Sequence, residues 1–151
     1  MSELLQVLTG FIGSIGFGIL FNIRGKRLLA ASLGGLFSWG LFLLLGTILP
    51  DEAVRYFIVA ACVSAYCEIM ARVMRTPTTT FLMTALIPLI PGGGLYYTMT
   101  NAFSGNMDGF MGRGMTTLSL AVALALGVVV TTVVTNVFVK LGRNRKGDKK
   151  L

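Results

Sequence analysis

The chain has 151 residues, of which 54% are hydrophobic and 13% are charged, and its formal net charge is +7. Together with a mean hydropathy of +0.79, this composition is typical of an integral membrane protein and argues against a water-soluble globular domain. Histidine is absent, which removes the commonest general base and metal ligand, so we expect no enzyme activity, no cofactor and no bound metal.

Apolar segments divide the chain into five stretches, each of about 17 to 25 residues, the length that crosses a hydrocarbon core of about 30 Å. They lie near residues 4–21, 28–49, 53–73, 79–100 and 114–139. We therefore predict an all-α integral membrane protein with five transmembrane helices in residues 1–139, with the lipid bilayer as its surroundings. A basic cytoplasmic tail is expected at residues 140–151.

Small residues recur in the first stretch, where Gly10, Gly13 and Gly16 are followed by Gly18. Such residues allow helices to approach closely in lipid, where packing drives association. Helix packing within the chain explains these glycines, and an interface with another subunit is the alternative.

In the second stretch Trp39 falls near the middle of the predicted span instead of at a membrane interface, so its indole N–H needs a partner either in the core or in a cavity.

Basic residues gather on one side of the predicted membrane. Lys and Arg number three in the first connection, one in the second, two in the third, one in the fourth and six in the tail. The first and third connections share a side with the tail, which gives eleven basic residues against two. The positive-inside rule then places the N-terminus outside and the C-terminus in the cytoplasm. Because these residues lie at segment ends and not in a stripe with stacking aromatics, nucleic acid is not an expected partner.

The third stretch contains Glu68, the carboxylate that lies well within a predicted span, and Arg72 follows four residues later. Charged groups at such depth are costly and mark candidate functional sites. One interpretation is a structural ion pair between neighbouring helical turns. The other is that Glu68 alternates between protonated and ionised states as the coupling site. Ser64 and Cys67 share its helical face, which is polar enough to line a path.

The fourth stretch contains PLIPGGG, in which Pro88 and Pro91 remove backbone donors and Gly92, Gly93 and Gly94 lower helix propensity. We predict that the fourth helix is broken near the midplane. Freed peptide groups survive at that depth only inside protein or beside a wet cavity, which indicates a transport pathway. The alternative is a kink repaired by neighbouring helices.

A half-helix that begins after the glycines would direct free N–H groups and the positive end of its dipole toward the membrane centre, which suits an anionic or zwitterionic solute. Hydroxyl groups flank the break on both sides. The candidate pathway residues are Thr84, Pro88, Pro91, Gly92, Gly93, Gly94 and Tyr96. Five spans also suggest one half of a transporter built from two halves, and because the chain shows no internal repeat, the second half is expected in another chain.

The run AYCEIMARVMRTPTTTFLMTALIPLIPGGGLYYTM, residues 65–99, resembles the signature of the C-terminal membrane module of the threonine/serine exporter family, and the five-span outline matches as well. The elements that carry the resemblance are Glu68, Arg72, Pro77, Pro88 to Gly94, and Tyr96. The chain looks like the form of the module that is made as a separate small subunit.

The resemblance implies a bacterial inner-membrane exporter of small carboxylate metabolites, with threonine and serine as substrates in fused members and a dicarboxylate such as succinate in some two-subunit members. It also implies a larger partner that supplies five more spans and a cytoplasmic N-terminal region. We expect a secondary exporter coupled to the proton gradient. A non-transporting assembly subunit is the alternative, and the pattern leaves open the choice between a channel and alternating access.

Overall fold

The computed structural model describes residues 3–147, which form helices joined by short connections, with no β-strand in that range. The helices are α1 (Glu3–Leu20), α2 (Lys26–Gly46), α3 (Glu52–Met74), α4 (Thr78–Ala85), the 3-10 helix η1 (Ile87–Leu89), α5 (Gly92–Phe103) and α6 (Met107–Gly147). The predicted all-α class is confirmed. Residues 148–151, at the end of the predicted basic tail, lie outside the described part of the chain.

Four of the helices are long and apolar enough to cross a membrane: α1, α2, α3 and α6 as far as Lys140. The fourth predicted span corresponds to α4, η1 and α5, which have 8, 3 and 12 residues and are each too short to cross alone. The predicted break of this segment is therefore present. The number of five spans and their orientation stay predictions.

The break follows from the two prolines. Pro88 has no amide hydrogen to donate to the Thr84 carbonyl, and Pro91 has none for Ile87, so the α-helical ladder fails at both positions. Between them Ile90 takes an extended conformation, with φ −62° and ψ 124°. A new helix, α5, then begins directly at Gly92.

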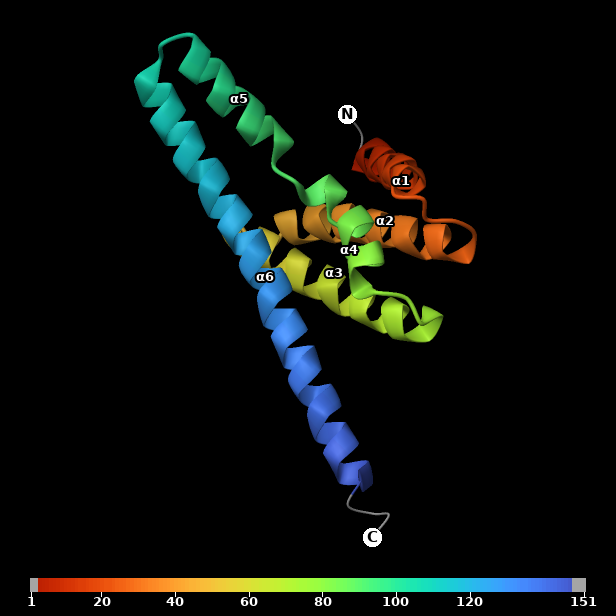
Figure 1. Ribbon diagram of the computed structural model, residues 1–151. Coiled ribbons are helices and arrows are strands. Elements are labelled where there is room, and N and C mark those ends of the chain that lie inside the picture. Colours follow the sequence, from red (N-terminus) through yellow and green to blue (C-terminus); the bar gives the residue numbers. More distant parts are fainter. Residues whose placement is uncertain (1–2, 148–151) are drawn as a thin grey trace.

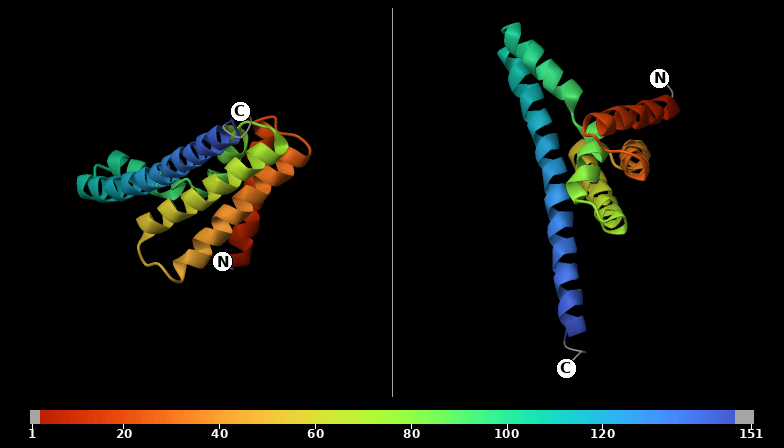
Figure 2. Two further views of the ribbon diagram at one scale, coloured as in Figure 1. Left: turned by 90° about the horizontal axis from the view of Figure 1, so that it is seen from below. Right: turned by 45° about the vertical axis from the view of Figure 1, so that its right-hand side comes forward.

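The helices form a compact group from which one hairpin extends. α2 packs against α1, α3 and α4, and α3 packs along α6. Figure 1 shows the hairpin of α5 and α6 reaching away from the other helices, and the second view in Figure 2 shows α6 extending past them at the opposite end as well. The break between α4 and α5 thus lies where the hairpin leaves the group.

Close approaches between helices depend on small residues. A Cβ at Gly35 of α2 would overlap the Ser14 hydroxyl of α1, and one at Gly127 of α6 would lie 2.5 Å from the Phe57 carbonyl oxygen of α3. The α3–α6 seam also holds a hydrogen bond from the Thr131 hydroxyl to the Ala61 carbonyl, at 3.2 Å. The seam therefore consists of tight backbone contact with one polar link.

The glycines of α1 serve two purposes. Gly18 packs against Leu28 and Gly10 lies close to Trp39, which agrees with packing inside the chain. Side chains added at Gly13 and Gly16 would meet no atom within 4 Å. These two positions are therefore open within the chain, and the alternative of a subunit seam stays a prediction there.

α6 is longer than the predicted fifth span. It begins at Met107 instead of near residue 114, because the Asn106 side chain accepts a hydrogen bond from the Gly109 amide at 3.0 Å and so caps the first turn. A sharp turn with Gly105 at φ +74° precedes it. The helix also continues to Gly147, past the expected start of the tail, since lysine and arginine are good helix formers.

We predict that Gly127→Ala destabilises the protein by about 1–3 kcal/mol, because the added methyl group meets backbone atoms of α3 that cannot move aside. Gly40→Ala is the matched control, since its methyl group meets nothing within 4 Å and alanine favours the helix. Thermal unfolding in detergent, followed by the fluorescence of Trp39, measures both variants. Equal melting temperatures for the two variants would contradict the close α3–α6 contact.

Candidate functional site

A cavity of about 310 Å³ lies beside the break between α4 and α5. Its walls come from the break itself and from α2, α3 and α6. The residues that line it are Trp39, Glu52, Tyr56, Pro88, Ile90, Pro91, Gly92, Gly93, Gly94, Arg113, Thr116, Thr117 and Leu120. The break is therefore where residues far apart in the sequence meet, from residue 39 to residue 120, a separation of 81 positions.

The break contributes Pro88, Pro91 and the three glycines, which are five of the seven candidate pathway residues. α5 has no side-chain cap at its start, and its first α-helical hydrogen bond runs from the Leu95 amide to the Pro91 carbonyl at 3.1 Å. The Gly92 amide donates to the Ile90 carbonyl at 2.7 Å, which leaves the Gly93 and Gly94 amides without an intrahelical acceptor. This wall of the cavity is therefore electropositive.

The other two candidates, Thr84 and Tyr96, lie outside the lining. Thr84 is fully buried one turn before the break, where it packs close to Gly18, and its hydroxyl has no hydrogen-bond partner among the described residues. The Tyr96 side chain is 66% exposed and rests against Tyr97, with ring centroids 5.5 Å apart. Although Thr84 and Tyr96 lie close to the break in the sequence, neither hydroxyl lines the cavity.

α3 supplies two polar side chains to the cavity. The Asp51 carboxylate caps this helix by accepting hydrogen bonds from the Ala53 and Val54 amides, at 2.9 and 3.2 Å. The cap fixes the first turn, and Glu52 and Tyr56, four residues apart, then lie on one helical face. Tyr56 is only 6% exposed, and its hydroxyl makes no hydrogen bond to a described residue. It is therefore available to a ligand.

α6 supplies residues at helical spacing: Arg113, Thr116, Thr117 and Leu120. The Thr117 hydroxyl donates to the Arg113 carbonyl at 2.8 Å and packs against Gly94, where a Cβ would lie 2.5 Å from the hydroxyl oxygen. The Arg113 guanidinium lies 5.6 Å from the centre of the Tyr97 ring. The close approach at Gly94 thus brings Arg113 beside the start of α5.

Charges of both signs line the cavity without pairing. Among the described side chains, the ion pair found is Glu68 with Arg72, so neither Glu52 nor Arg113 has a charged partner within 4 Å. We did not predict from the sequence that Glu52 and Arg113 line a cavity, because both residues fell in segments expected to be loops. Arg113 was used only in the count of basic residues that orients the chain in the membrane. The Asn106 cap, which extends α6 to include Arg113, was the signal that could have found it.

Trp39 lines the cavity as well as packing in the core, so both sequence interpretations hold in part. Its indole stacks on Phe42 with centroids 5.3 Å apart, and Phe42 meets the edge of Tyr56 at 5.0 Å. The buried indole N–H has no acceptor among the described residues. A buried donor of this kind normally has a partner, so the oxygen of a ligand or of water would complete the site.

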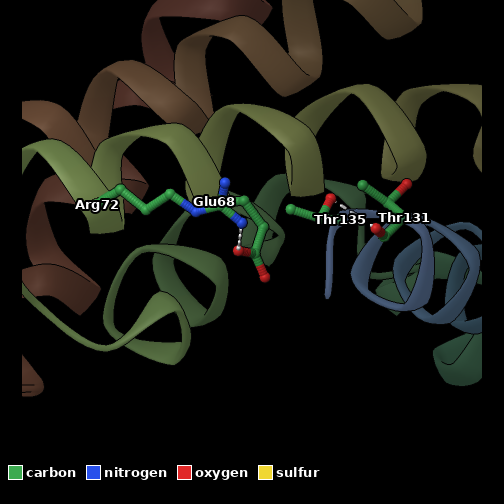
Figure 3. Close-up of polar contacts among 4 residues, drawn as sticks. All are labelled: Glu68, Arg72, Thr131 and Thr135. Atoms are coloured by element: carbon green, nitrogen blue, oxygen red, sulfur yellow. Dashed lines mark hydrogen bonds and ion pairs between the residues drawn. The ribbon is translucent and has the colours of Figure 1, made fainter. Parts of the chain in front are cut away.

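The ion pair of Glu68 and Arg72 lies elsewhere. Glu68 is twelve residues from Tyr56, which corresponds to roughly 18 Å along α3. Its Oε2 lies 3.4 Å from Arg72 Nη2, with the Glu68 side chain 12% exposed and that of Arg72 50% exposed. Figure 3 shows the pair on α3 with two threonines of α6 farther along the same seam, where the Thr135 hydroxyl donates to the Thr131 carbonyl at 2.7 Å. The pair and these threonines form a second polar centre.

The remaining members of the predicted polar face of α3 are enclosed. Cys67 is fully buried, and Ser64 is 1% exposed with a hydroxyl that has no hydrogen-bond partner among the described residues. Both lie within the helix packing, next to Glu68 in sequence but removed from the cavity lining.

Comparison with known proteins bears on both polar centres. The family model described as "Threonine/Serine exporter, ThrE" matches residues 6–134, a range that includes the cavity at the break and the pair of Glu68 and Arg72. The searches of curated proteins and of solved structures gave no match. Because the family model covers most of the described helices, the chain belongs to the threonine/serine exporter family.

Proposed function

We propose that the chain is a subunit of a bacterial inner-membrane secondary exporter and that the cavity at the break holds the exported solute, a small metabolite with a carboxylate. The observation that carries this proposal is the cavity of about 310 Å³ in which uncapped helix amides meet unpaired charges. Membership of the family supports the transport of amino acids. The chemistry of the cavity supports the place of binding.

The carboxylate of the solute would lie at the start of α5. The Gly93 and Gly94 amides need acceptors there, and the helix dipole adds a favourable positive field. Arg113 supplies a full positive charge to the same cavity. Because Gly92 and Gly93 bear no side chains, and a Cβ at either would meet no atom within 4 Å, the backbone is open to direct contact with the solute.

Glu52 bears on the choice of solute. An ammonium group would pair with this carboxylate while the α-carboxylate of the same molecule meets Arg113, which suits a zwitterionic amino acid such as threonine or serine. A dicarboxylate such as succinate would bring a second negative charge into the cavity that contains Glu52, and like charges repel. We therefore propose an amino acid as the solute in preference to a dicarboxylate.

The charged pair gives a test of this assignment. We expect Glu52→Gln to weaken threonine binding about tenfold or more, since a hydrogen bond to a charged group contributes about 1.5–3 kcal/mol, and to strengthen or leave unchanged any binding of succinate. Arg113→Gln should weaken the binding of both. Binding to purified protein in lipid nanodiscs measures these effects, with Arg24→Gln as a control remote from the cavity. Equal losses for both solutes in Glu52→Gln would contradict the ammonium site.

A second candidate function is assembly without contact to the solute, and the apolar groove between α5 and α6 favours it. This groove has a volume of about 950 Å³, and its lining includes Ile90, Leu95, Phe110, Met111, Met115 and Leu118. We propose that it receives the larger five-span partner that the half-transporter arrangement requires. A neighbouring reading frame that encodes a five-span protein with a polar N-terminal extension would support this partner.

The glycines of the break separate the two functions. Gly93→Ala adds a methyl group to the open cavity and should lower threonine export at least tenfold while the protein stays assembled with its partner. Gly94→Ala pushes against Thr117 and should also loosen the α5–α6 hairpin. Export from vesicles and co-purification of the partner measure the two effects. Intact export in Gly93→Ala, or loss of assembly alone, would favour the scaffold function.

We further propose that Glu68 couples export to the proton gradient. Its carboxylate is mostly enclosed, its contact with the half-exposed Arg72 is long, and Thr131 and Thr135 are the polar groups that α6 brings to the same seam. An exposed arginine at 3.4 Å stabilises an ion pair weakly. The contact with Arg72 therefore constrains the carboxylate only weakly.

Replacement of this carboxylate tests the coupling. Glu68→Gln should abolish accumulation driven by a pH gradient and should flatten the pH dependence of the remaining downhill flux, measured in proteoliposomes over a pH series. Arg72→Gln should change the rate less than about threefold, because an exposed pair contributes about 0–1 kcal/mol. Unchanged rates together with unchanged pH dependence in Glu68→Gln would remove this residue from the coupling step.

A further inference from the structure

A second cavity lies on the other side of the break, between α1, α2 and η1, with a volume of about 390 Å³. We refer to it as the α1 cavity. Its polar lining comes from Gln6 and Thr9 of α1, and the glycines Gly10 and Gly13 form the floor on the same helix. Two residues line both this cavity and the cavity at the break: Trp39 and Pro88.

We infer that the α1 cavity is a second binding chamber for the same small zwitterionic solute, and that Trp39 controls passage between the two chambers. The inference rests on the proposed function, since it extends the path of a solute held at the break. It gives Trp39 and α1 a role in selecting the solute and in its movement between the two cavities, which goes beyond binding at the break.

The wall between the chambers is thin. Trp39 and Pro88 each contribute to both linings, so the indole and the pyrrolidine ring are what separates the two spaces. On the α1 side, a Cβ at Gly10 would lie 3.5 Å from the Trp39 Cβ and 3.7 Å from the Pro88 ring, whereas one at Gly13 would meet no atom within 4 Å. Glycine at both positions keeps the space next to the wall open.

Although most of the α1 cavity lining is apolar, it contains the polar side chains of Gln6 and Thr9, which suit a solute or water better than lipid. The buried indole N–H of Trp39 has no acceptor among the described residues, and Trp39 is a lining residue of both cavities. Gln6 is half-buried on the other side of the chamber, where Thr9 donates its hydroxyl to the Gln6 carbonyl at 2.9 Å. An amide or an indole N–H that faces lipid tails goes unsatisfied, whereas a carboxylate, hydroxyl or water in the chamber would satisfy both.

η1 is the part of the wall that can move. Trp39 is held by its stacking on Phe42, whereas Pro88 belongs to a three-residue 3-10 helix between two interruptions of the backbone. Short 3-10 segments of this kind often mark hinges. A shift of η1 away from the fixed indole would join the two chambers and let the solute pass the indole N–H.

Labelling of engineered cysteines tests the second chamber. In a Cys62→Ala background, with Cys67 fully buried, Gly13→Cys should react with a charged, membrane-impermeant thiol reagent in proteoliposomes, and saturating threonine should slow the reaction at least fivefold. Gly16→Cys is the control, since an added Cβ there also meets no atom within 4 Å but the position lies outside the lining, and it should show no protection. Reaction of Gly13→Cys without protection by threonine would overturn the inference.

A third position distinguishes the failure of this inference from the failure of the proposed function. Thr116→Cys lies in the lining of the cavity at the break, replaces a side chain of similar size and should also be protected by threonine. Protection of Thr116→Cys without protection of Gly13→Cys would contradict the second chamber and leave the proposed function standing. If threonine protects neither position, both fail.

The role of Trp39 has its own test. Trp39→Phe keeps an aromatic ring against Phe42 but removes the N–H, so the KM for threonine export should rise about fivefold or more with little change in kcat. Trp39→Ala should open the wall and cause a leak of threonine down its gradient without coupling. Unchanged KM in Trp39→Phe together with no leak in Trp39→Ala would show that Trp39 only packs, and would overturn its assignment.

Discussion

The structure depends on the backbone around residues 86–94, where two prolines and three glycines prevent a continuous helix in a segment that is otherwise apolar enough for the membrane. Each peptide group freed there must find a partner, because hydrocarbon offers none. Short-range bonds satisfy some of them, such as the one from the Gly92 amide to the Ile90 carbonyl. The rest open onto cavities walled by α2, α3 and α6. The surrounding helices thus enclose a defect that lipid would not tolerate.

Two polar centres lie on the same helix, and their separation constrains any mechanism. Tyr56 lines the cavity at the break and Glu68 lies roughly 18 Å farther along α3, so a solute held at the break, as proposed, would not touch Glu68 in this arrangement. α6 also reaches both centres, through Arg113 at one and Thr135 at the other. The tight contact at Gly127 lies between them. Coupling would therefore require α3 and α6 to shift as one unit, with the wall at η1 as the responsive element.

Features that depend on a few neighbouring residues could be predicted from the sequence. Contacts between side chains of different helices, such as those that line the cavity, could not. The all-α class follows from the apolar stretches, and the break follows from Pro88 and Pro91, because each is a property of a few neighbouring residues. The separation of four between Glu68 and Arg72 likewise fixes their contact.

The members of the cavity that sequence reasoning missed include Glu52 and Tyr56 of α3 and Arg113 of α6, which meet only through packing. Thr84 shows the converse error, since closeness along the chain does not give the direction of a side chain. It packs near Gly18 because helix rotation, set by the α1–α4 contact, turns it away from the break. Helix α6 begins before the predicted span because Asn106 caps it, and a glycine-rich segment hid this capping residue.

The unpaired state of Glu52 and Arg113 is itself informative. Opposite charges in one cavity attract, and a direct pair would cross the space and exclude a solute. Both side chains are exposed, so water can solvate each charge until a ligand meets it. The proposed zwitterion would replace that water at both ends at once, with its own charges held at a fixed spacing. Selection of such a solute would then depend on how well this spacing matches the cavity, instead of on net charge.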